Sequence, residues 1–260
     1  MYAEMLCNYR RRYLNPASAN KPQTPHFALE PRRVHTITDR FSMANTYLIH
    51  DECLVVIDPG SDLNVRLLSH YMQTVLHHSP NAIDLIVLTH LHPDHTAGVE
   101  SLRRICTAPV AASATIRALA QSEEQSILPR ITHLTGHMLP GTLQHLDMFP
   151  PPYAQQAKLV DLWLDDVAGL PFHPDWRVIA SPGHTPDSLC LYNPFTGELL
   201  CGDTVITIAG GSPLLRSGTN RRQLEETLRI LRSLKVHYLY PGHGRQILGE
   251  TPLTNVQVEW

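Results

Sequence analysis

The chain has 260 residues, of which 43% are hydrophobic, and a formal net charge of −3 at neutral pH. This size and composition fit one large globular domain or two small halves, and the lack of a basic excess argues against a nucleic-acid partner. No apolar run approaches the ~20 residues needed to span a bilayer, so we expect no membrane segment.

The cysteines and the N-terminal segment bear on location and domain organisation. The five cysteines are dispersed, odd in number and never spaced as CxxC, which argues against a disulfide framework. Since the N-terminus also lacks the apolar core of a secretory signal, we expect a reducing, cytoplasmic location. Residues 1–33 are rich in Pro, Asn, Arg and Ala without periodicity. We interpret them as a tail or arm, followed by one domain over 34–260.

The first part of this domain alternates strand and helix patterns. Apolar runs at 46–50 and 53–58 predict two strands joined by a tight turn. Apolar residues on one face predict an amphipathic helix over 62–78. Residues 83–88 form a continuous apolar run, which is typical of a strand buried on both faces, and a helix is expected over 96–106. Helix, buried strand and helix in this order indicate an α/β fold.

The middle of the chain is less regular. A short strand at 109–112 and a helix over 113–125 are predicted first. Residues 126–158 then mix prolines with apolar side chains and show no clear period. A long irregular apolar segment of this kind is typical of a lid, a binding loop or an interface, and a core insertion would give the same pattern.

The last part of the domain is rich in predicted strands. Residues 159–164 and 168–172 predict a hairpin. Further strands are predicted at 176–180, 189–192, 199–201 and 237–240. The clearest helix covers 219–234, where Asn220 can act as N-cap and leucines recur on one face.

Residues that can bind a metal follow five of the predicted strands, each at a turn. These residues are Asp58, His90, His184, Asp203 and His243. Loops at the ends of strands are where α/β folds carry their sites, and neutral imidazole and carboxylate are ligands of zinc and similar ions. The densest stretch is HxHxDH, formed by His90, His92, Asp94 and His95.

Two metal sites can be built from this set. Alternate residues of an extended loop can point the same way, which places His90 and His92 together. We therefore expect one site of His90, His92 and His184, a second of Asp94, His95 and His243, and Asp203 as a bridge between them. The cofactors would be two divalent ions, with zinc as the first choice and iron or manganese as alternatives.

The five motifs together resemble the metallo-β-lactamase superfamily of hydrolases. They are Val-Val-Ile-Asp-Pro-Gly with the Asp58 turn, HxHxDH at 90–95, Ser-Pro-Gly-His184, Cys-Gly-Asp203-Thr and Pro-Gly-His243-Gly. All occur in the superfamily's order, and the resemblance covers about residues 43 to 247.

This resemblance implies a fold and roles for individual residues. The fold is a four-layer αββα sandwich of two mixed sheets with helices outside, with a dinuclear centre at one edge. The counterpart of Asp58 supports the centre without being a ligand. The counterpart of Asp94 is a ligand that also orients the attacking water, so Asp94 is the expected catalytic residue.

The same resemblance suggests hydrolysis of an ester, thioester or lactone carbonyl in a small-molecule substrate, by a hydroxide that bridges the two ions. Glyoxalase II-like thioesterases carry a helical C-terminal domain, whereas only 17 residues follow His243 here. Lactone hydrolases carry a tyrosine just after the bridging aspartate, where this chain has Val205, Ile206 and Thr207. The subfamily therefore stays open.

Three alternatives also remain at this point. One is a mono-iron sulfur oxygenase of the same fold. Another is a small phosphodiesterase or endoribonuclease, for which no basic stripe is visible. The third is a regulatory protein that binds metal without catalysis. The chain could also form a homodimer in each case.

Overall fold

The computed structural model describes residues 33–39, 41, 44–51, 53–125, 152–207, 213–215, 218–249, 252–254 and 256–258. The chain divides after Arg33, and the helices and strands described below belong to the unit over 34–260. The expected arm over residues 1–32 and the 126–151 part of the expected lid lie outside the described residues, so both stay predictions. No helix in the described ranges has the length and apolar character needed to cross a membrane.

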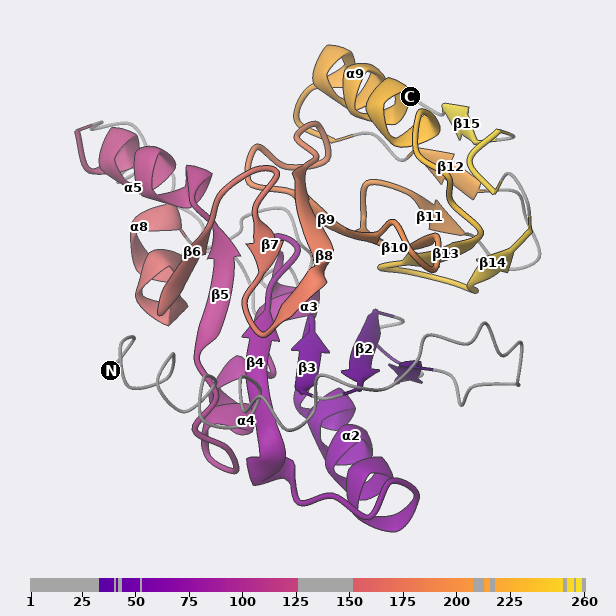
Figure 1. Ribbon diagram of the computed structural model, residues 1–260. Coiled ribbons are helices and arrows are strands. Elements are labelled where there is room, and N and C mark those ends of the chain that lie inside the picture. The colour runs from indigo at the N-terminus through magenta and orange to yellow at the C-terminus, as the bar shows by residue number, and fades with distance from the viewer. Residues whose placement is uncertain are drawn as a thin grey trace, which may run out of the picture. The chain divides into compact units, whose positions relative to one another are not determined.

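The first sheet has six strands in the order β1-β2-β3-β4-β5-β6 (Figure 1). Its first three strands pair antiparallel, and the pairs from β3 to β6 are parallel. The strands are β1 (Val34–Thr38), β2 (Asn45–His50), β3 (Leu54–Ile57), β4 (Ile83–Val87), β5 (Val110–Ser113) and β6 (Leu162–Leu164). The apolar run predicted to be a buried strand is β4, which lies inside this sheet as expected.

The second sheet also has six strands, in the order β14-β13-β10-β9-β8-β7. Only the β10–β13 pair is parallel among them. Its strands are β7 (Gly169–Leu170), β8 (His173–Ala180), β9 (Leu189–Asn193), β10 (Glu198–Gly202), β13 (Tyr238–Pro241) and β14 (Ile247–Leu248). A small third sheet contains β11 (Ile206–Thr207), β12 (Pro213–Leu215) and β15 (Gln257–Val258).

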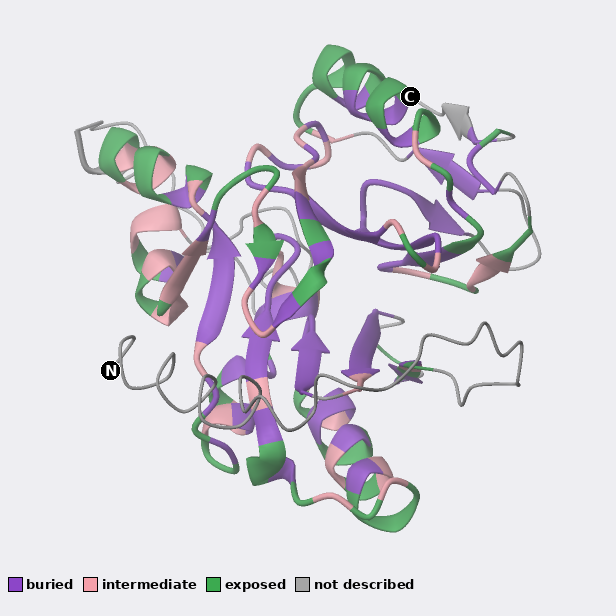
Figure 2. Ribbon diagram, in the orientation of Figure 1, coloured by how far each residue is buried: buried purple, intermediate pink, exposed green. Residues whose placement is uncertain are grey.

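Helices cover the outer faces of both sheets. The helices are α2 (Asp62–Thr74), α3 (Pro93–Thr96), α4 (Val99–Arg103), α5 (Thr115–Gln125), α8 (Tyr153–Gln156) and α9 (Arg221–Arg232), with 3₁₀ turns η2 at Pro80–Ala82 and η3 at Ala157–Leu159. As predicted, the side chain of Asn220 caps α9 by accepting the N–H of Gln223. In Figure 2 the strands are largely buried, whereas α2 and α9 each carry an exposed side.

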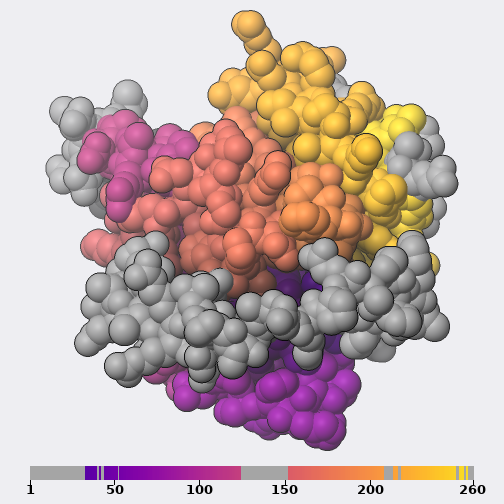
Figure 3. Space-filling view, viewed as in Figure 1, coloured from indigo at the N-terminus to yellow at the C-terminus, as the bar shows by residue number. Residues whose placement is uncertain are grey.

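Three apolar clusters hold these layers together. One joins α2, α4 and α5 to the first sheet, a second lies between the two sheets, and a third joins α9 to the second sheet. Fully or nearly fully buried members of the three are, in turn, Leu68 and Leu102, Val87 and Trp176, and Leu199 and Leu231. Two mixed sheets flanked by helices are the predicted αββα arrangement, and Figure 3 shows the outer surface of these elements from one side.

The predicted hairpin of 159–164 and 168–172 is wrong. Its first strand, β6, extends the first sheet by pairing with β5, whereas β7 pairs with β8 at the edge of the second sheet. The turn between them therefore carries the chain from one sheet to the other. An apolar run indicates that a strand is buried. It does not indicate which other strand pairs with its backbone N–H and C=O groups, because that strand can lie far along the chain.

Two helices end earlier than predicted. The helix expected to reach residue 78 ends at Thr74, and Val75, expected on its buried face, is 54% exposed. The N–H of His78 donates to the carbonyl of Met72, and His77 has a φ of 57°, which is a turn that closes a helix. The helix expected over 96–106 is the shorter α4, which ends at Arg103, and neither α3 before it nor β1 was predicted.

Hydrogen bonds between the two sheets fix one edge of the sandwich. The hydroxyl of Tyr47 donates to the carbonyl of Pro241 at 2.7 Å, and the side-chain amide of Asn45 donates to the same carbonyl at 2.9 Å. The N–H of Leu189 donates to the carbonyl of Thr89 at 2.8 Å. The loops that follow β3, β4, β8, β10 and β13 meet at this edge, where the predicted ligands lie.

The core between the sheets gives a test of the fold. Trp176 is 1% exposed and packs in that core, so Trp176→Ala should lower the free energy of unfolding by about 3–5 kcal/mol. Phe195 is an aromatic residue that is 79% exposed, and Phe195→Ala should change the same free energy by less than about 0.5 kcal/mol. Urea unfolding of both variants measures the difference, and equal losses would contradict the proposed core.

Candidate metal centre

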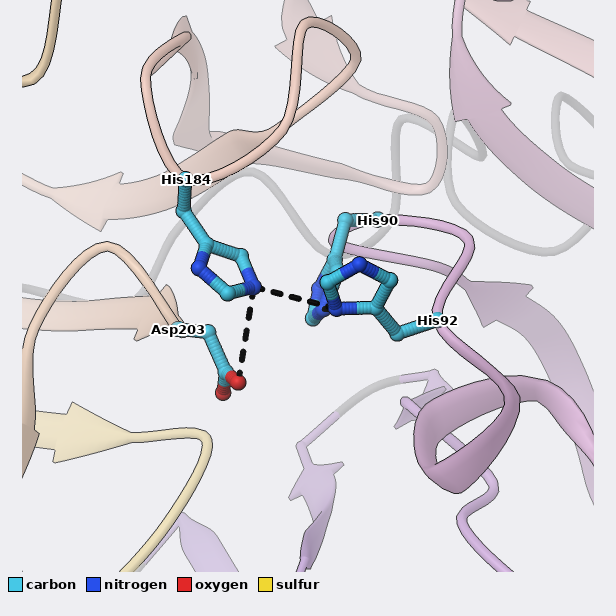
Figure 4. Close-up of side chains that lie close together, drawn as sticks. All are labelled: His90, His92, His184 and Asp203. Carbon is cyan, nitrogen blue, oxygen red and sulfur yellow. Dashed lines mark hydrogen bonds and ion pairs between the residues drawn. The ribbon is translucent and has the colours of Figure 1, made fainter. Parts of the chain in front are cut away.

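The structure brings all seven predicted ligand residues to one edge of the sandwich. His90 and His92 lie in the loop after β4, Asp94 and His95 in α3, His184 in the loop after β8, Asp203 just after β10, and His243 just after β13. Figure 4 shows His90, His92, His184 and Asp203 facing one another from three loops. Two of the three donor groups at this edge contain the residues of the two predicted sites, and Asp203 lies with the first of them.

The first donor group contains three histidines. Nδ1 of His92 lies 3.1 Å from Nε2 of His90 and 3.1 Å from Nε2 of His184. Two nitrogens bound to one tetrahedral zinc ion lie about 3.3 Å apart, since each zinc–nitrogen bond is about 2.0–2.1 Å. The spacing of these three nitrogens therefore fits ligands of a single ion.

The second donor group lies beside the first. Nε2 of His243 is 3.0 Å from Oδ2 of Asp94 and 3.4 Å from Nε2 of His95. Asp203 lies between the groups. Its Oδ2 is 3.4 Å from Nε2 of His243 and 3.6 Å from Nε2 of His184, while its Oδ1 is 3.3 Å from Nε2 of His95. Its two oxygens thus reach both groups, as a bridging carboxylate must.

Unsatisfied polar atoms support a fit to metal ions. Oδ1 of Asp94 is buried and accepts no hydrogen bond from the described residues. Ring nitrogens of the first group also face one another, since Nδ1 of His92 lies 3.1 Å from Nε2 of both His90 and His184. Buried acceptors without donors cost free energy, and a cation removes that cost. The donor set of imidazoles and carboxylates is one that suits zinc, iron or manganese.

Asp58 supports the second group from outside it. Its Oδ1 accepts the N–H of Thr89 at 2.7 Å, and its Oδ2 accepts the Thr89 hydroxyl at 2.6 Å and Nδ1–H of His95 at 2.9 Å. Because Nδ1 of His95 donates to Asp58, its Nε2 faces the centre and is the nitrogen that an ion would bind after displacing the proton there. Asp58, His90 and His95 also lie close enough to form a third donor group, but these hydrogen bonds already engage both oxygens of Asp58.

Thr89 has a role that sequence reasoning missed. Its hydroxyl proton goes to Asp58, so its oxygen must accept from Nδ1–H of His90, which lies 3.1 Å away. This contact leaves Nε2 of His90 bare toward the first group. The sequence does carry one sign of this role, because Thr89 stands directly between the predicted buried strand and His90.

The two groups differ in charge. Burial lowers the pKa of His90 well below its ordinary value, and burial also lowers the pKa of His184 to about 4. Both rings are therefore neutral at pH 7 and can bind a metal without losing a proton. At both rings burial outweighs the opposing charge of Asp203.

Carboxylates dominate the second group. Burial opposes the charge of His95 and His243, but Asp203 and Asp58 raise the pKa of His95 well above its ordinary value. Hydrogen bonds to Asp203 and Asp94 raise the pKa of His243 to about 9. Burial likewise works to raise the pKa of Asp203, yet His95 and His243 hold it well below its ordinary value. Without metal, the second group is a set of ion pairs.

Comparison with known proteins places the chain in a family. The family model described as "Metallo-beta-lactamase superfamily" matches residues 39–243. The chain belongs to this superfamily. It is 26% identical over 204 residues to a protein named "Probable metallo-hydrolase" from Methanocaldococcus jannaschii, covering 77% of this chain and 87% of that one. It is 27% identical over 192 residues to a hydroxyacylglutathione hydrolase from Idiomarina loihiensis, covering 74% of this chain and 54% of that one.

Solved structures show the same fold. A metallo-β-lactamase family protein from Thermus thermophilus aligns with a TM-score of 0.61 at 20% identity, over 86% of this chain and 77% of that one. A protein solved in a di-iron-bound form aligns with a TM-score of 0.57 at 24% identity, over 83% of this chain and 94% of that one. Family membership, the metallo-hydrolase relatives and the donor groups together class this chain as a metal-dependent hydrolase.

Proton release should distinguish the two donor groups. Below pH 9 an ion must displace the proton of His243. Metal affinity at the second group should therefore fall roughly tenfold for each unit by which the pH is lowered, for each proton displaced. His184 has a pKa of about 4 and is already deprotonated at pH 7, so it should release no proton when the first group binds an ion. Calorimetric titration of metal-free protein in buffers of different ionisation enthalpy counts the protons. Equal release for both ions would contradict this charge difference.

Gly242 should be required for the position of Asp203. A Cβ at Gly242 would lie 2.1 Å from Oδ1 of Asp203 and 2.9 Å from Cε1 of His95. Gly242→Ala should displace the carboxylate and weaken metal binding by about 10–100-fold, as measured by chelator competition. Gly249 has no atom within 4 Å of its would-be Cβ, so Gly249→Ala is the matched control and should bind metal like the wild type.

Proposed function

We propose that the protein is a dinuclear metal-dependent hydrolase that cleaves the carbonyl carbon–oxygen or carbon–sulfur bond of a small ester, thioester or lactone. The observation that carries this proposal is the pair of donor groups joined by Asp203. A structural metal site fills every coordination position with protein ligands, whereas a catalytic site keeps positions open. Seven donors shared between two ions leave such positions.

The residues have distinct roles in this proposal. His90, His92 and His184 would hold one ion, Asp94, His95 and His243 would hold the other, and Asp203 would contribute to both. When bound, the ions supply hydroxide at neutral pH and a Lewis acid for the carbonyl oxygen. We favour zinc, and iron is the main alternative because a structural neighbour was solved in a di-iron-bound form.

Asp94 is the proposed catalytic residue. Burial works to raise its pKa, but the hydrogen bond from His243 holds that pKa below its ordinary value, so Asp94 is a carboxylate at neutral pH. One oxygen, Oδ2, lies 3.0 Å from Nε2 of His243, and the buried Oδ1 is left to accept a proton from the attacking water. Asp94 would then pass this proton to the leaving oxygen or sulfur as the carbonyl bond breaks.

The relatives favour a thioester within the proposed range of substrates. Several of them are named hydroxyacylglutathione hydrolase, and two of these, from Idiomarina loihiensis and Ectopseudomonas mendocina, are 27% and 28% identical to this chain. The chain spans 54% and 51% of the length of these two proteins. Their activity therefore supports a class of substrate for this chain but does not assign its substrate.

Activity against a panel of small esters, thioesters and lactones tests the proposal. Asp94→Asn should lower kcat by about 10²–10⁴-fold on the best substrate, because the proton acceptor is lost. His90→Ala should lower both activity and metal content. Asp165 and His70 are exposed residues away from the centre, so Asp165→Asn and His70→Ala are matched controls that should retain wild-type rates.

Several results would overturn this proposal. Equal turnover by the wild type, Asp94→Asn and His90→Ala would exclude catalysis at this centre. One iron per chain with oxygen consumption on a persulfide would identify a sulfur oxygenase. Cleavage of phosphodiesters alone would identify a nuclease-like enzyme. Tight ligand binding without turnover of any class would identify a regulatory protein.

A further inference from the structure

The turn that carries His243 has little stiffness of its own, because His243 stands between two glycines. Both glycines lie against other groups. A Cβ at Gly242 would be 2.1 Å from Oδ1 of Asp203, and a Cβ at Gly244 would be 1.7 Å from the carbonyl oxygen of Thr207. Glycine leaves the backbone more conformational freedom than any other residue. Contacts from outside the turn must therefore fix the position of His243.

Asn45, the first residue of β2 in the first sheet, supplies such contacts. Its side-chain Nδ2 donates to the carbonyl of Pro241 and to the carbonyl of Gly244, each at 2.9 Å. Its backbone N–H donates to the carbonyl of Gly242 at 2.7 Å. One residue of the first sheet thus holds the turn both before and after His243.

The partners of the Asn45 amide define how it is oriented. The hydroxyl of Thr38 donates to Oδ1 of Asn45 at 2.5 Å, so that oxygen faces away from the turn. The NH₂ group carries two hydrogens, and it faces the two carbonyls of the turn. Asn45 is 1% exposed, and a buried carbonyl that loses its donor costs free energy. The amide is therefore matched to the two ends of this turn.

A shift of the turn would act on the second donor group. Nε2 of His243 lies 3.0 Å from Oδ2 of Asp94 and 3.4 Å from Nε2 of His95. Metal–ligand distances tolerate errors of only about 0.2 Å, so a small displacement of His243 would weaken binding of an ion there. The three histidines of the first group lie in the loops after β4 and β8, and their positions do not depend on this turn.

We infer that Asn45 is a positioning residue of the proposed metal centre, which fixes the turn over residues 241–244 so that Nε2 of His243 reaches the second ion. A purely structural role would also use these hydrogen bonds, by joining the two sheets. The two roles differ in their consequences, because only a positioning role makes the affinity for one particular ion depend on Asn45. The inference rests on the proposed metal centre, but not on any substrate.

Metal affinity of the full-length chain tests this role without relying on turnover. Asn45→Ala should weaken binding of one of the two ions by about 10–100-fold in chelator competition and leave the other unchanged. The affected ion should be the one that His243→Ala also weakens. With Co²⁺ as the probe, Asn45→Ala should change the visible absorption of that same ion. A loss confined to the other ion, or equal losses for both, would overturn the inference.

Asn193 offers a matched control. It is also a buried asparagine, 3% exposed, and its Oδ1 accepts the N–H groups of Phe195 and Thr196 in the turn between β9 and β10. The predicted ligands lie elsewhere. Asn193→Ala should therefore lower the unfolding midpoint in urea but leave both metal affinities and the Co²⁺ spectrum unchanged. Equal metal losses in Asn193→Ala and Asn45→Ala would indicate a general loss of packing and would contradict a positioning role.

Thr38→Val gives a milder test that keeps the inference open to refutation if Asn45→Ala does not fold. The substitution removes the hydroxyl that orients the Asn45 amide and leaves the turn itself unaltered. It should weaken the ion that depends on His243 by about 2–10-fold, the range that one neutral hydrogen bond accounts for. Unchanged affinity for that ion would overturn the inference.

These outcomes are separate from the fate of the proposed function. A chain inactive on every ester, thioester and lactone could still show the selective loss of one ion in Asn45→Ala. A chain that binds both ions and turns over substrate, with wild-type metal affinities and only a lowered unfolding midpoint in Asn45→Ala, would overturn the inference alone.

Discussion

The buried carboxylate of Asp58 is the interaction on which the centre depends. It accepts the N–H and hydroxyl of Thr89 and the outer N–H of His95, and so joins the end of β3 to the loop after β4 and to α3. Asp58 has a φ of 50°, a conformation that aspartate tolerates better than most residues. One side chain thereby orients the rings of His90 and His95, because the Thr89 hydroxyl that donates to Asp58 accepts Nδ1–H of His90.

The two donor groups differ in the charge of their side chains. In the first group burial keeps the rings of His90 and His184 neutral, whereas the second is a set of imidazolium and carboxylate groups. Asp203 belongs to both, because its oxygens face histidines of each group. A fold that placed Asp203 on one side only would create either an unpaired buried charge or a pair of unrelated sites.

Sequence alone predicted the features that depend on local spacing. The HxHxDH stretch, the turns after the strands and the N-cap Asn220 each lie within a few residues, and the structure places them as expected. The hairpin at β6 and β7 failed because pairing partners are distant in the chain. Thr89 was missed because a single polar residue has no period, and its role appears only when the fold supplies its partner.

The hydrogen bonds of Asn45 and Tyr47 to Pro241 have a thermodynamic consequence. They tie β2 of one sheet to the loop that carries His243 from the other, so the second donor group draws His95 from the first sheet's side and His243 from the second's. An ion bound there would connect the two sheets, and separation of the sheets would release it. Metal binding and closure of the two halves are thus linked equilibria, and free metal concentration should set how often the halves part.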